Sequence, residues 1–158
     1  MSVQFLAIRT EAVRALQGGG ADSNGQQPER KVSEGSGVPC RHCLKQVAEG
    51  RPYLVLGHRP FDTVQPYAEL GPIFLCAEAC ESGDCADVLP PFLTSAHYIV
   101  RGYGPDERIV YGTGAVTATD GILAYCGELL QRADVAFAHI RSASNNCFHV
   151  RVETGAGL

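Results

Sequence analysis

The sequence predicts an α+β fold, with a mostly antiparallel sheet, two or three helices and a cysteine-rich knuckle. Apolar residues make up 45% of the 158 positions, which is enough for one hydrophobic core. Segments with strand character outnumber segments with helical spacing. The two kinds do not alternate along the chain as they do in a doubly wound α/β protein. We therefore expect one domain spanning residues 1–158.

The N-terminal part predicts one strand, one helix and a surface segment. Residues 3–8 are apolar enough for a first strand. Thr10 is a suitable N-cap for a short helix that ends at Gln17, before three glycines. Residues 17–37 contain only two apolar side chains, so we expect a flexible surface segment there. At most a short strand is expected within it, at residues 30–33.

The middle of the chain is interrupted by prolines. Residues 53–56 predict a buried strand, because they are apolar and lie between a proline and a glycine. Residues 58–72 carry three prolines and predict an ordered loop without strand pairing. Residues 73–75 predict another short strand.

The C-terminal part predicts a hairpin, a helix and two more strands. Residues 98–103 and 108–112 flank a turn in which Pro105 presets the φ angle, so we expect them to pair. Apolar residues then recur at helical spacing up to Leu130, after a helix-start signal at residues 117–120. Residues 135–141 and 147–153 predict strands joined by a polar loop.

Charge and hydropathy exclude several classes of partner. Lys and Arg total 13 and Asp and Glu total 17, a net charge of −4. This balance disfavours a nucleic-acid binder, which needs a dense cationic surface. No apolar run approaches the roughly 20 residues that cross a bilayer, so no membrane partner is expected. Residues 1–10 do not resemble a secretion signal, and we expect a cytoplasmic location. The sequence leaves the oligomeric state open.

Seven cysteines are the strongest chemical feature of the sequence. In a reducing compartment, grouped thiols favour metal or redox roles over structural disulfides. Cys40 and Cys43 form a CxxC pair on a tight turn, which can hold one tetrahedral ion. Cys76 and Cys80 are four positions apart and would share one face if that segment were helical.

These four cysteines predict a structural zinc site. Four sulfur ligands match Zn²⁺, and such a closed site leaves no position for a reactive water. His42 and Cys85 are spare ligands nearby, and Leu44 stands where a glycine often follows the second cysteine of a knuckle. Two alternatives stay open: partly buried reduced thiols, and a redox switch through a disulfide between Cys40 and Cys43.

Several motifs in order along the chain resemble the bacterial family called domain of unknown function 1203. They are PCRHCL at residues 39–44, HRPF at 58–61, PYAE at 66–69, GPIF at 71–74, NCF at 146–148 and RVE at 151–153. The resemblance implies a compact α+β bacterial protein and supplies no activity. The position of Cys76 is also compatible with histidine in that family, which would suit zinc as well.

The last two predicted strands carry an alternative, enzymatic hypothesis. Cys147, His149 and Arg151 alternate with apolar residues that we expect to face the core. If odd positions pair with odd positions, His139 and Arg141 lie on the same surface. A thiol there could act as a nucleophile, with His149 or His139 as its base. An ordinary solvated sheet face is the alternative, since a one-residue slip separates the two sets.

The loop after residue 57 holds further candidate binding residues. Arg59 could clamp a carboxylate or phosphate, and His58 with Asp62 could form an acid–base pair. Arg59 could instead pair locally with Asp62 or Glu69. We therefore expect a binding domain for a small anion or a protein partner. Its candidate binding residues are His58, Arg59, Arg141 and Arg151.

Overall fold

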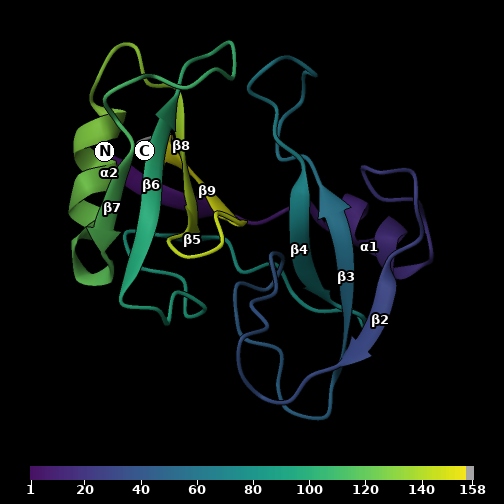
Figure 1. Cartoon of the computed structure of the whole chain (residues 1–158). Coiled ribbons are helices and arrows are strands. Elements are labelled where there is room, and N and C mark those ends of the chain that lie inside the picture. Colours follow the sequence, from purple (N-terminus) through teal and green to yellow (C-terminus); the bar gives the residue numbers. More distant parts are fainter. Residues whose placement is uncertain (156–158) are drawn as a thin grey trace.

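The computed structural model describes residues 1–155 and contains two antiparallel sheets and two α-helices (Figure 1). One sheet has the strand order β5-β1-β9-β8-β6-β7. Its strands are β1 (Ser2–Leu6), β5 (Cys85–Ala86), β6 (His97–Tyr103), β7 (Ala115–Ala118), β8 (Phe137–Ser142) and β9 (Phe148–Gly155). The other sheet has the order β2-β3-β4, with β2 (Glu29–Val32), β3 (Pro52–His58) and β4 (Gly71–Cys76). The predicted α+β class is confirmed.

Helix α2 (Ile122–Leu130) covers one face of the six-stranded sheet, on the left in Figure 1. A one-turn 3-10 helix, η1 (Thr119–Gly121), leads into it. The larger apolar core, called the first core below, lies between this helix and the sheet. It includes Val100, Ile140, Val150 and Val152 from the strands and Ile122, Cys126 and Leu129 from the helix. Burial of this apolar stripe stabilises a helix too short to persist alone.

The three-stranded sheet and helix α1 (Thr10–Gln17) build a second core, on the right in Figure 1. Val13 of the helix is fully buried against Leu54, Leu56, Ile73 and Leu75 of the strands. Phe148 of β9 joins this second core, and Phe137 of β8 is buried in a smaller cluster with Phe61 and Tyr103. Both faces of the six-stranded sheet are therefore covered.

The helix start at Thr10 differs from the predicted N-cap. Arg9 occupies the N-cap position and makes no side-chain cap hydrogen bond, while Thr10 is the first helical residue. The Thr10 hydroxyl lies 2.9 Å from Nε2 of His42. The hydroxyl is therefore taken by a tertiary contact, which the local sequence pattern did not contain.

The predicted hairpin between residues 98–103 and 108–112 forms only next to its turn. Ile109 forms a bridge with Tyr103, and the N–H of Val110 donates to the carbonyl of Gly102 at 3.0 Å, but the rest of β6 pairs with β7, with Ile99 opposite Val116. The physical reason is a side chain that binds the edge of β6. The hydroxyl of Thr113 accepts a hydrogen bond from the Gly102 N–H at 2.9 Å. This N–H is then not free to donate to the backbone of residues 108–112, so strand pairing with them does not continue.

A β-bulge also overturns the predicted surface of odd-numbered residues. His139 pairs with Arg151 and Ile140 with Val150, but Arg141 pairs with Phe148, so His149 is the extra residue. Phe148 therefore turns to the second core. His149 packs against Phe92 and Tyr98 in the first core, with ring centroids 5.4 and 5.3 Å away.

Residues 17–37 lie mostly at the surface and contain β2, an edge strand whose residues are all exposed. The Asp22 carboxylate accepts hydrogen bonds from the N–H groups of Gly57, Asn24 and Gln26. These bonds hold the pKa of Asp22 below its usual value, Gly57 having the largest effect. The flexibility of this segment stays a prediction. Among residues 1–155, no helix is long and apolar enough to cross a membrane.

Candidate metal centre

The first cysteine pair lies on a turn closed by backbone hydrogen bonds. The N–H of Cys40 donates to the carbonyl of Lys45, and the N–H of Leu44 donates to the carbonyl of Cys40, both at 3.0 Å. Leu44 has a φ of 59°, the left-handed conformation that glycine adopts at lowest cost. Its side chain is fully buried in the first core. Burial of this large side chain offsets the backbone strain, so the turn forms without the glycine.

Gly83 packs directly on the backbone of this turn. Its N–H donates to the carbonyl of His42 at 2.8 Å. A Cβ at this position would overlap the carbonyl carbon and oxygen of Cys43 and crowd the side chain of Leu44. Only glycine therefore allows the two segments to approach this closely.

The second cysteine pair is positioned by helix α1 and not by a helix of its own. Cys76 ends β4, and the residues between it and Cys80 are not helical, so the helical spacing considered from the sequence is wrong. Gln17 Nε2 donates to the carbonyl of Cys76 at 2.8 Å, and Arg14 Nη2 donates to the carbonyl of Cys80 at 2.7 Å. Two side chains of one helix turn thus hold both cysteines in place.

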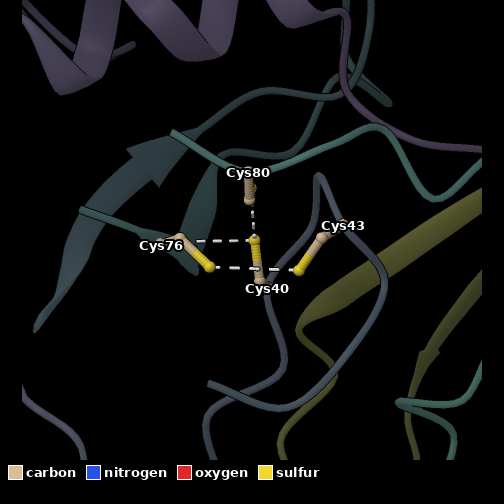
Figure 2. A group of neighbouring side chains, drawn as sticks. All are labelled: Cys40, Cys43, Cys76 and Cys80. Atoms are coloured by element: carbon tan, nitrogen blue, oxygen red, sulfur yellow. Dashed lines mark hydrogen bonds between the residues drawn. The ribbon is translucent and has the colours of Figure 1, made fainter. Parts of the chain in front are cut away.

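The four cysteines converge on one point (Figure 2). Their sulfur atoms all lie within 4.8 Å of one another, with Cys40 and Cys80 4.0 Å apart and Cys43 and Cys76 3.9 Å apart. Zinc–sulfur bonds of about 2.3 Å place tetrahedral ligands about 3.8 Å apart, close to these separations. A disulfide needs about 2.05 Å between its sulfurs, and all four cysteines are free thiols here. The group can therefore hold a metal ion.

Cys40 lies at the electrostatic centre of the group and is fully buried. Its sulfur accepts hydrogen bonds from the N–H groups of Cys76 at 3.2 Å and His42 at 3.4 Å. Contact with Cys43, and then with Cys76 and Cys80, lowers the pKa of Cys40 strongly. The negative sulfur of Cys40 in turn raises the pKa values of Cys76 and Cys80. A cation at the centre is what would allow all four to ionise together.

The two spare ligands predicted from the sequence have different positions. His42 Nδ1 lies 3.1 Å from the sulfur of Cys80, so this imidazole adjoins the group as an outer partner. Burial lowers its pKa and keeps the ring neutral. Cys85 lies apart, with its thiol 3.5 Å from the carbonyl oxygen of Val88.

The predicted anion-binding residues do not form one cluster. His58 and Arg141 line one cavity, and His58 and Arg151 line another. The side chain of Arg59 donates to the backbone carbonyl of Ala68 at 3.4 Å, and its backbone N–H donates to the hydroxyl of Ser23 at 3.1 Å. The structure gives neither the pairing of Arg59 with Asp62 or Glu69 nor a hydrogen bond between His58 and Asp62, within residues 1–155.

The partners of Glu69 and the role of Glu107 were not predicted from the sequence, which named Glu69 only as a local partner of Arg59. Glu69 joins Arg101 and Arg141, at 3.0 and 2.8 Å. Glu107 is 8% exposed and accepts the N–H groups of Asp62 and Thr63 at 2.9 and 2.8 Å, which fixes the proline-rich loop. No local pattern could have found these partners, because they lie 32 or more positions away in sequence.

The predicted catalytic trio is not assembled. The Cys147 thiol contacts the carbonyl oxygen of Asn145 at 3.7 Å, and His149 Nδ1 lies 3.1 Å from the backbone oxygen of Cys147. His139 is fully buried on the other side of the sheet, among the rings of Tyr103, Phe137 and two further phenylalanines. Burial lowers the pKa of both imidazoles, that of His149 to about 3. Among the described residues, neither forms a hydrogen bond with the Cys147 thiol.

The fold and the site define an α+β protein with a four-cysteine cluster able to hold a metal ion. A family model described as protein of unknown function (DUF1203) matches residues 37–154, which include all four cysteines of the cluster. The chain therefore belongs to the DUF1203 family, as the motif resemblance predicted. No curated protein and no solved structure matches the chain.

Proposed function

We propose that this protein is a binding domain held together by one structural zinc ion, with Cys40, Cys43, Cys76 and Cys80 as the ligands. The observation that carries the proposal is the convergence of four sulfur atoms within 4.8 Å of one another. Thiolate sulfur in a four-coordinate, tetrahedral set is the preferred environment of structural zinc. A closed set of four protein ligands gives the ion no open position, so its role is structural.

The ion would link the turn at residues 40–43 to the chain after β4. Thirty-two residues separate Cys43 from Cys76, and closing a loop of this length removes conformational freedom from the unfolded chain. The loop includes β3 and β4, so the ion would fix the three-stranded sheet against α1 and Phe148. Metal binding would then contribute directly to the free energy of folding.

Metal analysis of the purified protein tests this proposal. We expect about one zinc ion per chain after expression without added zinc and gel filtration, and loss of the ion in Cys76→Ser. The matched control is Cys85→Ser, because Cys85 is also a half-buried thiol but lies outside the cluster. A zinc content far below one per chain in the wild-type protein would refute the proposal.

Thiol reactivity, measured on the same protein samples, distinguishes a zinc site from a redox switch. Zinc-bound cysteines react slowly with a thiol reagent until a chelator is added, and then the four cysteines of the cluster react. A redox switch predicts a different result, in which mild oxidation removes two reactive thiols and a reductant restores them. Chelator-dependent release of four thiols supports the zinc site.

A further inference from the structure

Arg141 of β8 has one guanidinium nitrogen without a partner. Its side chain is 5% exposed. Nε donates to Asn146 Oδ1 at 2.9 Å, and Nη2 donates to Glu69 Oε2 at 2.8 Å and to the carbonyl of Asn146 at 2.9 Å. Nη1 is buried and donates to nothing among the described residues. A buried donor left unpaired destabilises the fold, so an acceptor from outside the chain would be stabilising here.

Arg141, Arg101 and Glu69 together carry a net charge of +1. Glu69 also accepts a hydrogen bond from Arg101 Nη2 at 3.0 Å, so two arginines share one carboxylate. Burial, and after it the charge of Arg41, lowers the pKa of the neighbouring His58 to about 4. That imidazole is therefore uncharged at neutral pH. This balance suits a ligand with a single negative charge.

Arg141 lines a cavity of about 220 Å³ between the two sheets. Its apolar wall includes Pro60, Leu70 and Phe148, and its polar wall includes Asn145 and the Cys147 residue. A volume of this size holds a small organic molecule, since a liquid water occupies about 30 Å³. The combination of an apolar wall with one unpaired donor is typical of a small-ligand site.

We propose that this cavity binds a small monocarboxylate, whose carboxylate is attracted by the buried guanidinium of Arg141 and whose short hydrocarbon part contacts Phe148. The proposal takes the binding role from the proposed function and is independent of the zinc ion. Inorganic phosphate fits less well, because Glu69 is part of the cavity wall and would repel a second negative charge.

Cys147 allows a direct test, because it lines the same cavity. Iodoacetate is itself a small monocarboxylate, and iodoacetamide is its neutral analogue. In both reactions the thiolate sulfur attacks the CH₂ carbon, the S–C bond forms, iodide leaves, and the thiol proton goes to solvent. Site-resolved mass spectrometry of the protein as purified measures the rate at each cysteine, and metal content is measured separately.

We expect the ratio of iodoacetate rate to iodoacetamide rate at Cys147 to exceed that at Cys85 by about tenfold, because the site concentrates the anion. The iodoacetate rate at Cys147 should saturate with concentration. Propionate should protect Cys147 from iodoacetate, whereas propionamide, which has nearly the same shape and no charge, should not. These comparisons use the wild-type protein and do not depend on a variant that folds.

Arg141→Gln should remove the preference of Cys147 for iodoacetate. The matched control is Arg132→Gln, because Arg132 is exposed and pairs with Asp134. Equal ratios at Cys147 and Cys85, or equal protection by propionate and propionamide, would overturn the proposal. Stronger protection by inorganic phosphate than by propionate would overturn the assigned ligand class. Loss of zinc with the preference intact would refute the metal site alone.

Discussion

His42 Nδ1 lies 3.1 Å from the sulfur of Cys80, although His42 lies in the sequence between Cys40 and Cys43. The opposite nitrogen of the ring, Nε2, lies 2.9 Å from the Thr10 hydroxyl at the start of α1. The imidazole therefore connects the helix to a cysteine that follows β4. Partners of this kind orient the ligands of a metal ion and adjust its affinity.

Replacement of this imidazole is expected to weaken zinc binding without unfolding the protein. His42→Ala should reduce the zinc affinity by about 10- to 100-fold, the range typical of outer partners of metal ligands. Competition with a chelator of known affinity measures the change. His97→Ala is the control, because His97 is exposed at the start of β6. An unchanged affinity in His42→Ala would show that the contact with Cys80 is incidental.

Removal of the metal is expected to loosen the three-stranded sheet first. The ion would tie that sheet to the turn at residues 40–43, whereas the core under α2 contains no cysteine of the cluster. Hydrogen exchange before and after chelation measures this difference strand by strand. Protection should fall in β3 and β4 and persist in β6 and β8. A uniform loss of protection would contradict a local role for the ion.

The close approach of Gly83 to the cysteine turn predicts a destabilising substitution. Gly83→Ala should lower the free energy of unfolding by at least 1–3 kcal/mol, the usual range for overpacking, because its Cβ meets backbone atoms of Cys43. Urea unfolding measures the change. Gly71→Ala is the control, since a Cβ at Gly71 has no neighbour within 4 Å. Equal effects of the two substitutions would contradict the packing argument.

The buried imidazole of His149 predicts loss of stability in acid. Burial lowers its pKa from 6.5 to about 3, so between these pH values the unfolded chain binds a proton that the folded chain does not. The stability that the neutral ring supports is complete above pH 6.5 and is lost as the pH falls toward 3. The slope contributed by this one group is about 1.4 kcal/mol per pH unit.

Comparison of the wild-type protein with His149→Phe isolates this contribution. Both proteins contain the other buried groups that titrate in acid, such as His58, whose pKa burial lowers to about 4, so the difference between their pH slopes reports His149. The phenylalanine ring can occupy the same site beside Phe92 and Tyr98. Urea midpoints between pH 7 and pH 4.5 measure the slopes. Parallel slopes would exclude His149 as a source of acid sensitivity.

The periodicity of the sequence predicted the elements whose environment is local. Helix α2 and strands β3, β6, β8 and β9 lie where apolar spacing predicted them, within one or two residues at most ends. The spacing of Cys40 and Cys43 on a turn also predicted a metal-binding geometry. The sequence did not predict the left-handed φ of Leu44, because the burial that stabilises it comes from residues far along the chain.

The sequence by itself therefore determined the fold class, the family motifs and which four cysteines to compare. Only the tertiary structure decided which side chains face one another. The bulge at His149 shifts the strand by one residue, and since strand side chains alternate with a period of two, Phe148 and His149 exchange faces. Likewise, the pairing of Arg141 with Glu69 joins residues 72 positions apart, and no local spacing rule extends that far.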